Sequence, residues 1–591
     1  MSFDDSGLIS GSQQESRKPR TLQPPALWAW ATGLWLALVS GLAFFHGLFS
    51  LAPLDKTEAL QIGIAETMLR LGEWVVPEWN GYLYADKPPL PYWLAELVWS
   101  RFGLIPVLAR IPAALAATAG VASLAWLTHQ CCRQDMPLRQ AWARTALAGT
   151  LLAFSPGWIA FGHTAVHDIY LALAVMLALG GYALGFGGAS QQKRPLLAAL
   201  WIGLCCGFGF LAKGLLGIGL PLLIIAVDAT FHPASRRLLL RPGSLALFSG
   251  GLLAVVTPWI AALINGRHWA FLQGFLGFSH LQRATQAVDG HDQPLLFYLP
   301  VLLGLIWPWW PLLLSALRQL WHRRRHWHQA EARIERLQQL AAVWLLLGMV
   351  LFSAIPTKLP GYVLPLLPAA VLLIATDPKH PTWCLRLVSL QLGLLSAALL
   401  AGLIGMRLGK LGSYGQALLA APGGTTLWLA IGSILALLAA LYGGWIHQGS
   451  QATIRCWVAL LISMLLLVSC LPALARPYRQ LEQQPVLELA RAAHLRHGKA
   501  DVLYVLGRPR YSVVVEAELA TIFGSPLKTP SAKPISSLAN WKRHGTDPEA
   551  LVLGNCPSVA ALGEDPSLRI TLLEQRRNTC LARLHRKAAL P

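Results

Sequence analysis

Long apolar stretches recur along the chain and are separated by short polar segments. Examples are "LWLALVSGLAFFHGLF" (34–49), "LAVMLALGGYALGF" (173–186) and "CWVALLISMLLLVSCL" (456–471). Apolar runs of this length predict helices that cross a lipid bilayer, because a helix satisfies its own backbone hydrogen bonds in lipid. No period-two alternation appears, which argues against a membrane barrel. We expect about thirteen spans, at about 27–50, 105–127, 142–157, 160–187, 195–212, 214–231, 244–265, 294–317, 338–355, 360–376, 384–405, 425–446 and 455–475.

Basic residues gather in alternate loops between these spans, and this asymmetry predicts the orientation of the chain. The basic loops are "CCRQDMPLRQ" (131–140), "QQKR" (191–194), "SRRLLLR" (235–241) and "RQLWHRRRHWHQAEARIER" (318–336). Loops rich in Lys and Arg remain in the cytoplasm. We therefore expect residues 1–26 to be a cytoplasmic tail, residues 27–475 to be a membrane domain and residues 476–591 to lie outside, in the periplasm if the membrane is a bacterial inner membrane.

Two segments outside the membrane carry helical periodicity. In the first outer loop (51–104), "EALQIGIAETMLRLGEW" (58–74) and "PLPYWLAELVWSRFG" (89–103) each predict a helix lying on the membrane surface. A second outer loop, 266–293, is expected to hold another surface helix.

The C-terminal segment has a different pattern and predicts a small α/β domain. Short β-type runs occur at 500–507, 511–519, 550–556 and 567–575, and "VLELARAAHLRHG" (486–498) predicts a helix. Residues 525–537 resemble a flexible insertion. Cys556 and Cys580 are the only cysteines of this segment, and we expect them to form a disulfide if it meets an oxidising compartment.

Composition agrees with a membrane protein. Of 591 residues, 55% are hydrophobic and only 13% are charged. The net charge of +20 could indicate nucleic acid binding, but the basic residues follow the loop asymmetry described above. We therefore expect a polytopic α-helical membrane protein with a small C-terminal α/β domain outside the membrane. Membrane lipids, and not nucleic acid, are its expected surroundings.

Ionisable residues from at least six segments fall at the outer ends of the predicted spans. Each one has an ordinary explanation, since a lone lysine at a helix end usually reaches for lipid phosphate and an aspartate before a helix is often an N-cap. Their convergence on one face predicts instead a site where bases hold an anionic group and an acid serves as general base. The residues are Asp55, Glu58, Asp86, Lys87, Arg110, His163, His167, Asp168, Lys213, His280, Arg283 and Lys358.

Four motifs stand out along the chain. The first is the outer loop "LDKTEALQIGIAETMLRLGEWVVPEWNGYLYADKPPLPYWL" (54–94), and the three others are "RIPAALAA" (110–117), "GFLAKGLLGIGLPLL" (209–223) and "TKLPGYVLPLLPAAVLLIA" (357–375). Together they resemble the integral-membrane glycosyltransferases of the protein O-mannosyltransferase and aminoarabinose transferase type, with the GT-C fold, and the loop is similar to the first outer loop of that family. The resemblance implies transfer of a sugar, with inversion, from a polyprenyl-phosphate carrier to an acceptor on the outer face.

The resemblance also implies roles for individual residues. Asp55 is similar to the catalytic acid of the first loop, with Asp168 as a second acid. Because the loop begins "DK" where "DE" is common in the family, Glu58 is an alternative to Asp55. The donor phosphate would be bound by Lys87, Tyr84, Lys213, Arg283, Tyr362 and Lys358.

Several alternatives remain at this level. A lipid-linked sugar flippase or transporter would also need outer-face bases, and a membrane polymerase or ligase of glycans would share the fold. The acceptor could be lipid A, a protein, or another lipid or glycan. We expect a monomer and assign no cofactor to it. His268, His280 and His291 with Asp86 could bind a divalent metal ion.

Overall fold

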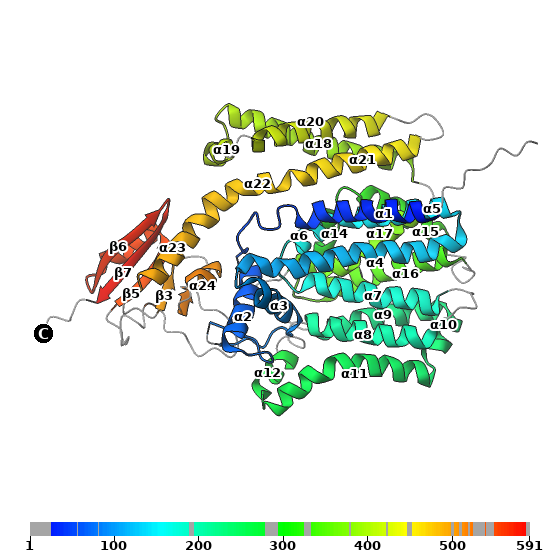
Figure 1. Ribbon diagram of the computed structural model, residues 1–591, viewed down its shortest axis with the longest axis horizontal. Coiled ribbons are helices and arrows are strands. Elements are labelled where there is room, and N and C mark those ends of the chain that lie inside the picture. The colour runs from blue at the N-terminus through cyan, green and yellow to red at the C-terminus, as the bar shows by residue number, and fades with distance from the viewer. Residues whose placement is uncertain are drawn as a thin grey trace, which may run out of the picture.

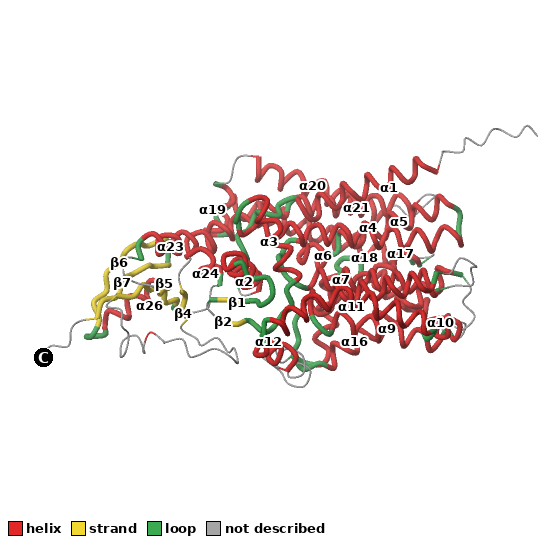
Figure 2. The backbone as a smooth tube through the Cα atoms, turned by 60° about the horizontal axis from the view of Figure 1, so that its bottom comes forward, coloured by secondary structure: helices red, strands yellow, loops and turns green. Residues whose placement is uncertain are grey.

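The computed structural model places a bundle of membrane-type helices beside a small domain built on a β-sheet (Figure 1). It describes residues 25–55, 57–80, 82–187, 194–277, 293–323, 332–377, 380–420, 424–445, 452–497, 502–506, 511–517, 520–523, 538 and 549–586. In both views the sheet lies at one end of the helical body, near α2 (Thr57–Leu71) and α24 (Ser512–Ala517) (Figures 1 and 2).

The helical body contains the predicted apolar runs. Its elements are α1 (Pro25–Ser40), η1 (Gly41–Phe45), α4 (Ile111–Asp135), α5 (Leu138–Ala153), α6 (Pro156–Gly162), α7 (Asp168–Phe186), α8 (Pro195–Lys213), α9 (Leu216–Phe231), α10 (Pro233–Leu239), α11 (Pro242–Asn265), α14 (Tyr298–Leu305), α15 (Trp310–Arg323), α16 (Arg333–Ala354), η6 (Pro360–Leu366), α17 (Leu367–Thr376), α18 (Thr382–Arg407), α20 (Gly424–Trp445) and α21 (Ala452–Ser469). Within the described ranges, nine helices are long and apolar enough to cross a membrane, or eleven if each of two bent pairs is one span. The expected number of about thirteen is not confirmed, because α9 and the stretch Pro360–Thr376 are shorter apolar helices.

Two predicted spans are not single helices. The span expected at 160–187 is interrupted, because α6 ends at Gly162 and α7 begins at Asp168. The span expected at 294–317 bends by 115° between α14 and α15. Pro308 lies in this second break and cannot supply a backbone N–H to a continuous helix. The first break provides a short turn at the outer end of α7, where several of the candidate site residues lie.

The first outer loop folds as expected. It contains α2 (Thr57–Leu71), the short strands β1 (Glu78–Trp79) and β2 (Tyr82–Leu83), α3 (Leu90–Phe102) and η2 (Pro106–Arg110). Both predicted helices are thus confirmed, and their place at the membrane surface stays a prediction. Of the second outer loop, the structure describes α12 (Trp269–Gln273), and residues 278–292 lie outside the described residues.

The C-terminal segment forms a five-stranded mixed sheet in the order β4-β3-β5-β7-β6. Its elements are α23 (Gln484–Leu495), β3 (Val502–Val505), α24 (Ser512–Ala517), β4 (Ala520–Phe523), β5 (Glu549–Asn555), α26 (Cys556–Ala561), η8 (Leu562–Glu564), β6 (Leu568–Arg576) and β7 (Thr579–Arg586). β3 pairs in parallel with β4 and β5, and β7 pairs antiparallel with β5 and β6. The predicted insertion at 525–537 lies outside the described residues.

One part of the tail prediction is wrong. Within the β-type run at 511–519, residues Ser512–Ala517 form α24, a short helix, instead of a strand. A single turn of helix has little intrinsic stability, so tertiary contacts decide its conformation. Val513 and Ala517 of α24 are buried in the cluster that joins the tail to α2 and α3.

The two faces of the sheet have separate cores, as the alternation of strand side chains requires. Leu503, Leu551 and Leu581 pack with Ile62 and Met68 of α2. Their neighbours Tyr504, Val552 and Ala582 pack on the opposite face with Val559 of α26. The tail and the first outer loop therefore share one core.

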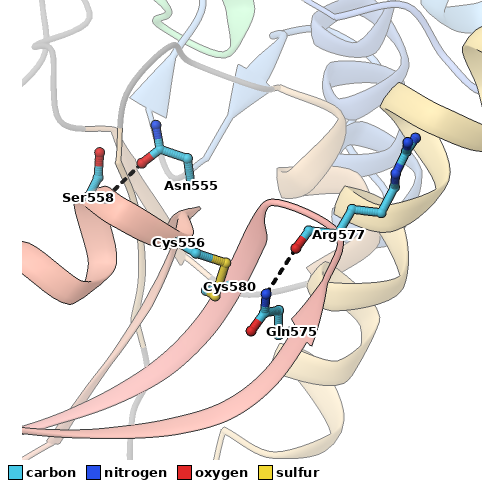
Figure 3. The surroundings of a disulfide bond; sticks show 6 residues. All are labelled: Asn555, Cys556, Ser558, Gln575, Arg577 and Cys580. Atoms are coloured by element: carbon cyan, nitrogen blue, oxygen red, sulfur yellow. Dashed lines mark hydrogen bonds between the residues drawn. A yellow bond between two sulfur atoms is a disulfide. The ribbon is translucent and has the colours of Figure 1, made fainter. Parts of the chain in front are cut away.

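The predicted disulfide is confirmed. The bond joins Cys556 at the start of α26 to Cys580 in β7, with 4.9 Å between their Cα atoms (Figure 3). The side chain of Asn555 caps α26 by accepting a hydrogen bond from the N–H of Ser558. The seven remaining cysteines, all in the described part of the chain, are free and buried.

Candidate active site

A buried ion pair fixes the start of α2 against the helical body. The carboxylate of Glu58 receives two hydrogen bonds of 2.7 Å from Arg110, one from Nε to Oε1 and one from Nη2 to Oε2. The backbone N–H of Leu54 donates to Oε2, and that of Ala165 donates to Oε1. Glu58 is 1% exposed and Arg110 is 2% exposed. Four N–H donors therefore occupy the carboxylate.

Arg110 uses all its donors in this cluster. Besides the two bonds to Glu58, it donates to the carbonyls of Leu48, Leu51 and Ala52. A guanidinium has five N–H groups, and all five are engaged. We call Glu58, Arg110 and the backbone groups they bind the Glu58–Arg110 clamp. It fastens the segment before α2 to the turn between α6 and α7, three residues before Asp168.

Asp55 lies just before α2 and is exposed to solvent. Its Oδ1 accepts hydrogen bonds from the backbone N–H of Ser512, at 3.1 Å, and from the Ser512 hydroxyl, at 2.5 Å. Ser512 is the first residue of α24, so Asp55 acts on that helix as an N-cap supplied by a distant segment. Among the described residues, Oδ2 of Asp55 has no hydrogen-bond donor. No described residue therefore competes with a ligand for this second oxygen.

Lys87 lies in the proline-rich segment between β2 and α3. Its ammonium group pairs with Oδ2 of Asp86 at 3.0 Å, and the Tyr84 hydroxyl donates to the same oxygen at 3.1 Å. The lysine and aspartate side chains are 18% and 13% exposed. The sequence placed Tyr84 and Lys87 together at the candidate site, and they share one carboxylate oxygen.

His167 connects this group to a second lysine. Burial, followed by the positive charges of Lys87 and Lys213, holds the pKa of His167 well below its usual value. The imidazole packs edge-on against the Tyr92 ring, with 5.2 Å between the ring centroids. A neutral histidine thus lies within electrostatic reach of both lysines, which brings the first outer loop and the end of α8 to one place.

Lys213, at the end of α8, forms a close ion pair with Oδ1 of Asp168, the first residue of α7. Its ammonium lies over the Tyr362 ring, 4.8 Å from the centroid. Gly361 permits this approach, since a Cβ there would lie 2.6 Å from Asp168 Oδ1. Three sequence-predicted residues, Asp168, Lys213 and Tyr362, are therefore in direct contact.

Lys358 lies in the same segment as Tyr362 and is 6% exposed. No described residue forms an ion pair with it. Its neighbour Leu359 donates its backbone N–H to the hydroxyl of Tyr298, in α14, at 3.1 Å. A buried lysine without a counter-ion in the described part of the chain is a natural partner for an anionic ligand. Arg283 lies outside the described residues, so its role stays a prediction.

The histidines proposed as metal ligands do not form a described site. His280 and His291 lie outside the described residues, and no group of three or more His, Cys, Asp or Glu residues gathers among those described. Asp86 is engaged by Lys87 and Tyr84. The metal stays a prediction that depends on residues 278–292.

A cavity of about 540 Å³ has Leu54, the residue before Asp55, in its lining. Leu48 and Leu51 also line it, and α6, α18, α21 and α22 (Leu471–Tyr478) contribute apolar side chains such as Ile159, Leu399 and Leu467. Arg110 and His163 are among its polar lining residues. Its lining is suited to a hydrocarbon chain.

Sequence reasoning missed Ser512 and Tyr298. Ser512 precedes a short apolar run, and a serine in that position is a helix N-cap signal, but the β-branched residues after it favoured a strand. Tyr298 was hidden within a predicted span. The sequence places Arg110 and His167 at the outer face, but it indicates no role for either of them in the site.

Comparison with protein-family models finds no match. Among curated proteins, the chain is 34% identical over 471 residues to an undecaprenyl phosphate-α-4-amino-4-deoxy-L-arabinose arabinosyl transferase of Pseudomonas paraeruginosa, covering 76% of this chain and 77% of that protein. A protein of the same description from Pseudomonas aeruginosa is 36% identical over 339 residues. That match covers 55% of this chain and 57% of the relative, so the chain spans little more than half of its length.

Solved structures show the same fold. ArnT from Cupriavidus metallidurans bound to undecaprenyl phosphate aligns with a TM-score of 0.72 and 18% identity, over 94% of this chain and 98% of that one. The structure of the same protein in the apo state gives a TM-score of 0.70. Together with the sequence identity to the Pseudomonas proteins, these similarities show that the chain belongs to the undecaprenyl phosphate-α-4-amino-4-deoxy-L-arabinose arabinosyl transferase family of GT-C membrane glycosyltransferases.

Proposed function

We propose that this protein transfers 4-amino-4-deoxy-L-arabinose from an undecaprenyl-phosphate carrier to a lipid acceptor of the lipid A class, on the outer face of a bacterial inner membrane. The name of its relatives supports the donor. The observation that carries the proposal is the gathering of Lys87, Lys213 and Lys358 at one end of the helical body, together with a large apolar cavity lined in part by His163 and Thr164 of the turn before Asp168.

The lysines supply the electrostatics for the departing lipid phosphate. Lys213 pairs with Asp168 and Lys87 pairs with Asp86, and Lys358 has no ion-pair partner among the described residues. A phosphate entering between them adds negative charge that grows as the bond to the sugar breaks. Fixed cations stabilise that growing charge without reorganising. Tyr84, Tyr362 and Arg283 complete the proposed phosphate site.

Asp55 is the proposed general base. It removes the proton of the acceptor hydroxyl while the acceptor oxygen attacks the anomeric carbon. The electron pair of the broken bond leaves with the lipid phosphate, and the configuration inverts. Exposure and a free Oδ2 suit Asp55 to this role. Glu58 does not suit it, because four N–H donors already occupy its oxygens. We assign Glu58 to positioning and Asp168 to orienting Lys213.

The apolar cavity favours a lipid acceptor over a protein. Its lining includes Leu54, the residue before the proposed base, and is mostly apolar. An acyl chain held there would bring a head-group hydroxyl or phosphate toward Asp55. Burial of apolar surface at roughly 25 cal/mol per Å² makes such a cavity effective for hydrocarbon. A hydrophilic peptide would gain little from it.

The proposed orientation has the N-terminus in the cytoplasm and the tail in the periplasm. The Cys556–Cys580 disulfide supports it, because structural disulfides persist in oxidising compartments. If the two bent pairs and the two shorter apolar helices each cross the membrane, they and the nine longer helices make thirteen crossings. We propose domain boundaries at about residues 26 and 475, and a monomer as the working unit.

Purified protein in detergent tests the function. It is incubated with undecaprenyl-phosphate aminoarabinose and lipid A, and the products are measured by mass spectrometry. We expect a new lipid carrying the aminosugar, and at least about a hundredfold less of it with Asp55→Asn. Consumption of donor with a peptide or glycan but not with lipid A would contradict the acceptor. Movement of donor across vesicles without any glycoside formed would identify a flippase instead.

A further inference from the structure

A second large cavity lies at the other end of the membrane helices, away from the candidate site. It has a volume of about 590 Å³ and is bounded by α4, α7 and α8. On α7 its wall runs from Met176 to Gly185, which spans about 14 Å at 1.5 Å per residue. Asp168, at the opposite end of α7, belongs to the candidate site. The catalytic proposal makes no use of this cavity.

The walls of the cavity are suited to a hydrocarbon chain. Leu127, Leu177 and Leu197 supply apolar surface, and Trp126 and Trp201 are among its lining residues. The two indoles are 56% and 45% exposed, so they face the surroundings of the bundle as well as the cavity. In a membrane, exposed indoles of this kind are typical of the zone near lipid head groups.

The end of the cavity carries positive charge. Arg194 precedes α8 and Arg333 begins α16, and both line the cavity. Nε of Arg333 is buried and has no hydrogen-bond partner among the described residues. Among the described residues that line the cavity, none is acidic. The nearby carboxylate of Asp135 accepts the backbone N–H of Ile334. Two arginines therefore line an apolar cavity whose described lining holds no acid to balance them.

We propose that this cavity binds one anionic phospholipid from the leaflet opposite the candidate site. An acyl chain occupies the apolar part, and Arg194 and Arg333 hold the phosphate of the head group. Guanidinium groups match phosphate through paired N–H donors. The phosphate held here is not that of a polyprenyl donor bound at the candidate site, because Gly185 and Asp168 are 17 residues apart on α7, about 26 Å. A lipid bound here would hold α4, α7 and α8 together.

A photoactivatable phosphatidylglycerol, with a diazirine in one acyl chain, tests the proposal on the full-length protein in nanodiscs. We expect labelling of peptides from 123–130 and 176–185, competed by unlabelled phosphatidylglycerol and not by phosphatidylcholine. The double variant Arg194→Gln with Arg333→Gln should reduce labelling by at least about tenfold, since each basic residue near lipid phosphate contributes about 1 kcal/mol.

A matched control keeps the test specific. Arg236 and Arg237 are exposed on α10 and do not line the cavity. Their double Gln variant removes the same charge and should leave the labelling unchanged. Equal competition by phosphatidylcholine, or equal loss in both double variants, would refute a specific phosphate site. Stronger competition by undecaprenyl phosphate than by phosphatidylglycerol would overturn the choice of ligand. A native mass spectrum of each variant, with its bound lipid, checks that it remains folded.

Discussion

Asp55 and Glu58 are only three residues apart, but their substitutions should have different effects. Glu58→Gln should lower the stability of the protein, and Asp55→Asn should lower the transfer rate. In the clamp, Oε1 of Glu58 accepts from Arg110 Nε and Ala165 N–H, and Oε2 accepts from Arg110 Nη2 and Leu54 N–H. Glutamine turns one of these oxygens into an NH₂ group. Whichever oxygen is replaced, two N–H donors then face another donor, and Arg110 becomes a buried cation without a counter-ion.

The magnitude follows from these contacts. Removing one partner of a buried ion pair costs about 3–5 kcal/mol, because the other charge remains unpaired. This cost corresponds to roughly 10²- to 10⁴-fold in the equilibrium between the clamped and released loop. We therefore expect Glu58→Gln to lower the thermal midpoint by several degrees and to lose activity through misfolding of the outer loop.

Asp55→Asn should behave in the opposite way. Asparagine retains an oxygen that accepts from Ser512, and Asn caps a helix about as well as Asp. The thermal midpoint should therefore stay close to that of the wild type. Transfer should fall by roughly a hundredfold or more, because the proton acceptor is gone.

The assay measures thermal midpoint and transfer rate side by side in purified variants. Glu488→Gln is the control, since Glu488 pairs with Arg576 at the surface and such a pair contributes less than about 1 kcal/mol. If Glu58→Gln melts like the wild type and abolishes transfer while Asp55→Asn stays active, the clamp assignment is wrong and Glu58 is the base.

Three further outcomes are expected. Lys87→Ala should slow transfer by about a hundredfold with little change in thermal midpoint. If the variant transfers as fast as the wild type at both limiting and saturating donor, Lys87 does not belong to the phosphate site. Glu96, in α3, is fully buried, and burial raises its pKa from 4.5 to about 8. The folded state keeps a proton that the unfolded state releases, so stability falls as pH rises from 4.5 to 8. Glu96→Gln should therefore raise the thermal midpoint at pH 9, and by less toward pH 5; a constant difference would contradict this. Replacing Cys556 and Cys580 by serine should cost about 3 kcal/mol for a loop of this length and increase proteolysis of the tail, and an unchanged digestion rate would refute it.

The sequence by itself determined the membrane class and most elements. Lipid offers no hydrogen-bond partners, so an apolar run such as 195–212 has to be helical, and α8 covers Pro195–Lys213. The first outer loop was equally readable, because α2 and α3 each follow a helical period and end near Gly72 or Gly103. The motifs placed Lys87, Lys213 and Tyr362 on one face before any contact was known.

The tertiary structure decided the conformation of residues Ser512–Ala517 and the different surroundings of Asp55 and Glu58. Local preference favoured a strand there, but Asp55 caps Ser512 and the shared core covers Val513, so a helix forms. Sequence could not distinguish Asp55 from Glu58, since both are acids at the start of one helix. Arg110 and the N–H of Ala165 come from distant segments and occupy only Glu58. Which carboxylate keeps a free oxygen depends on long-range packing, which no local pattern of residues encodes.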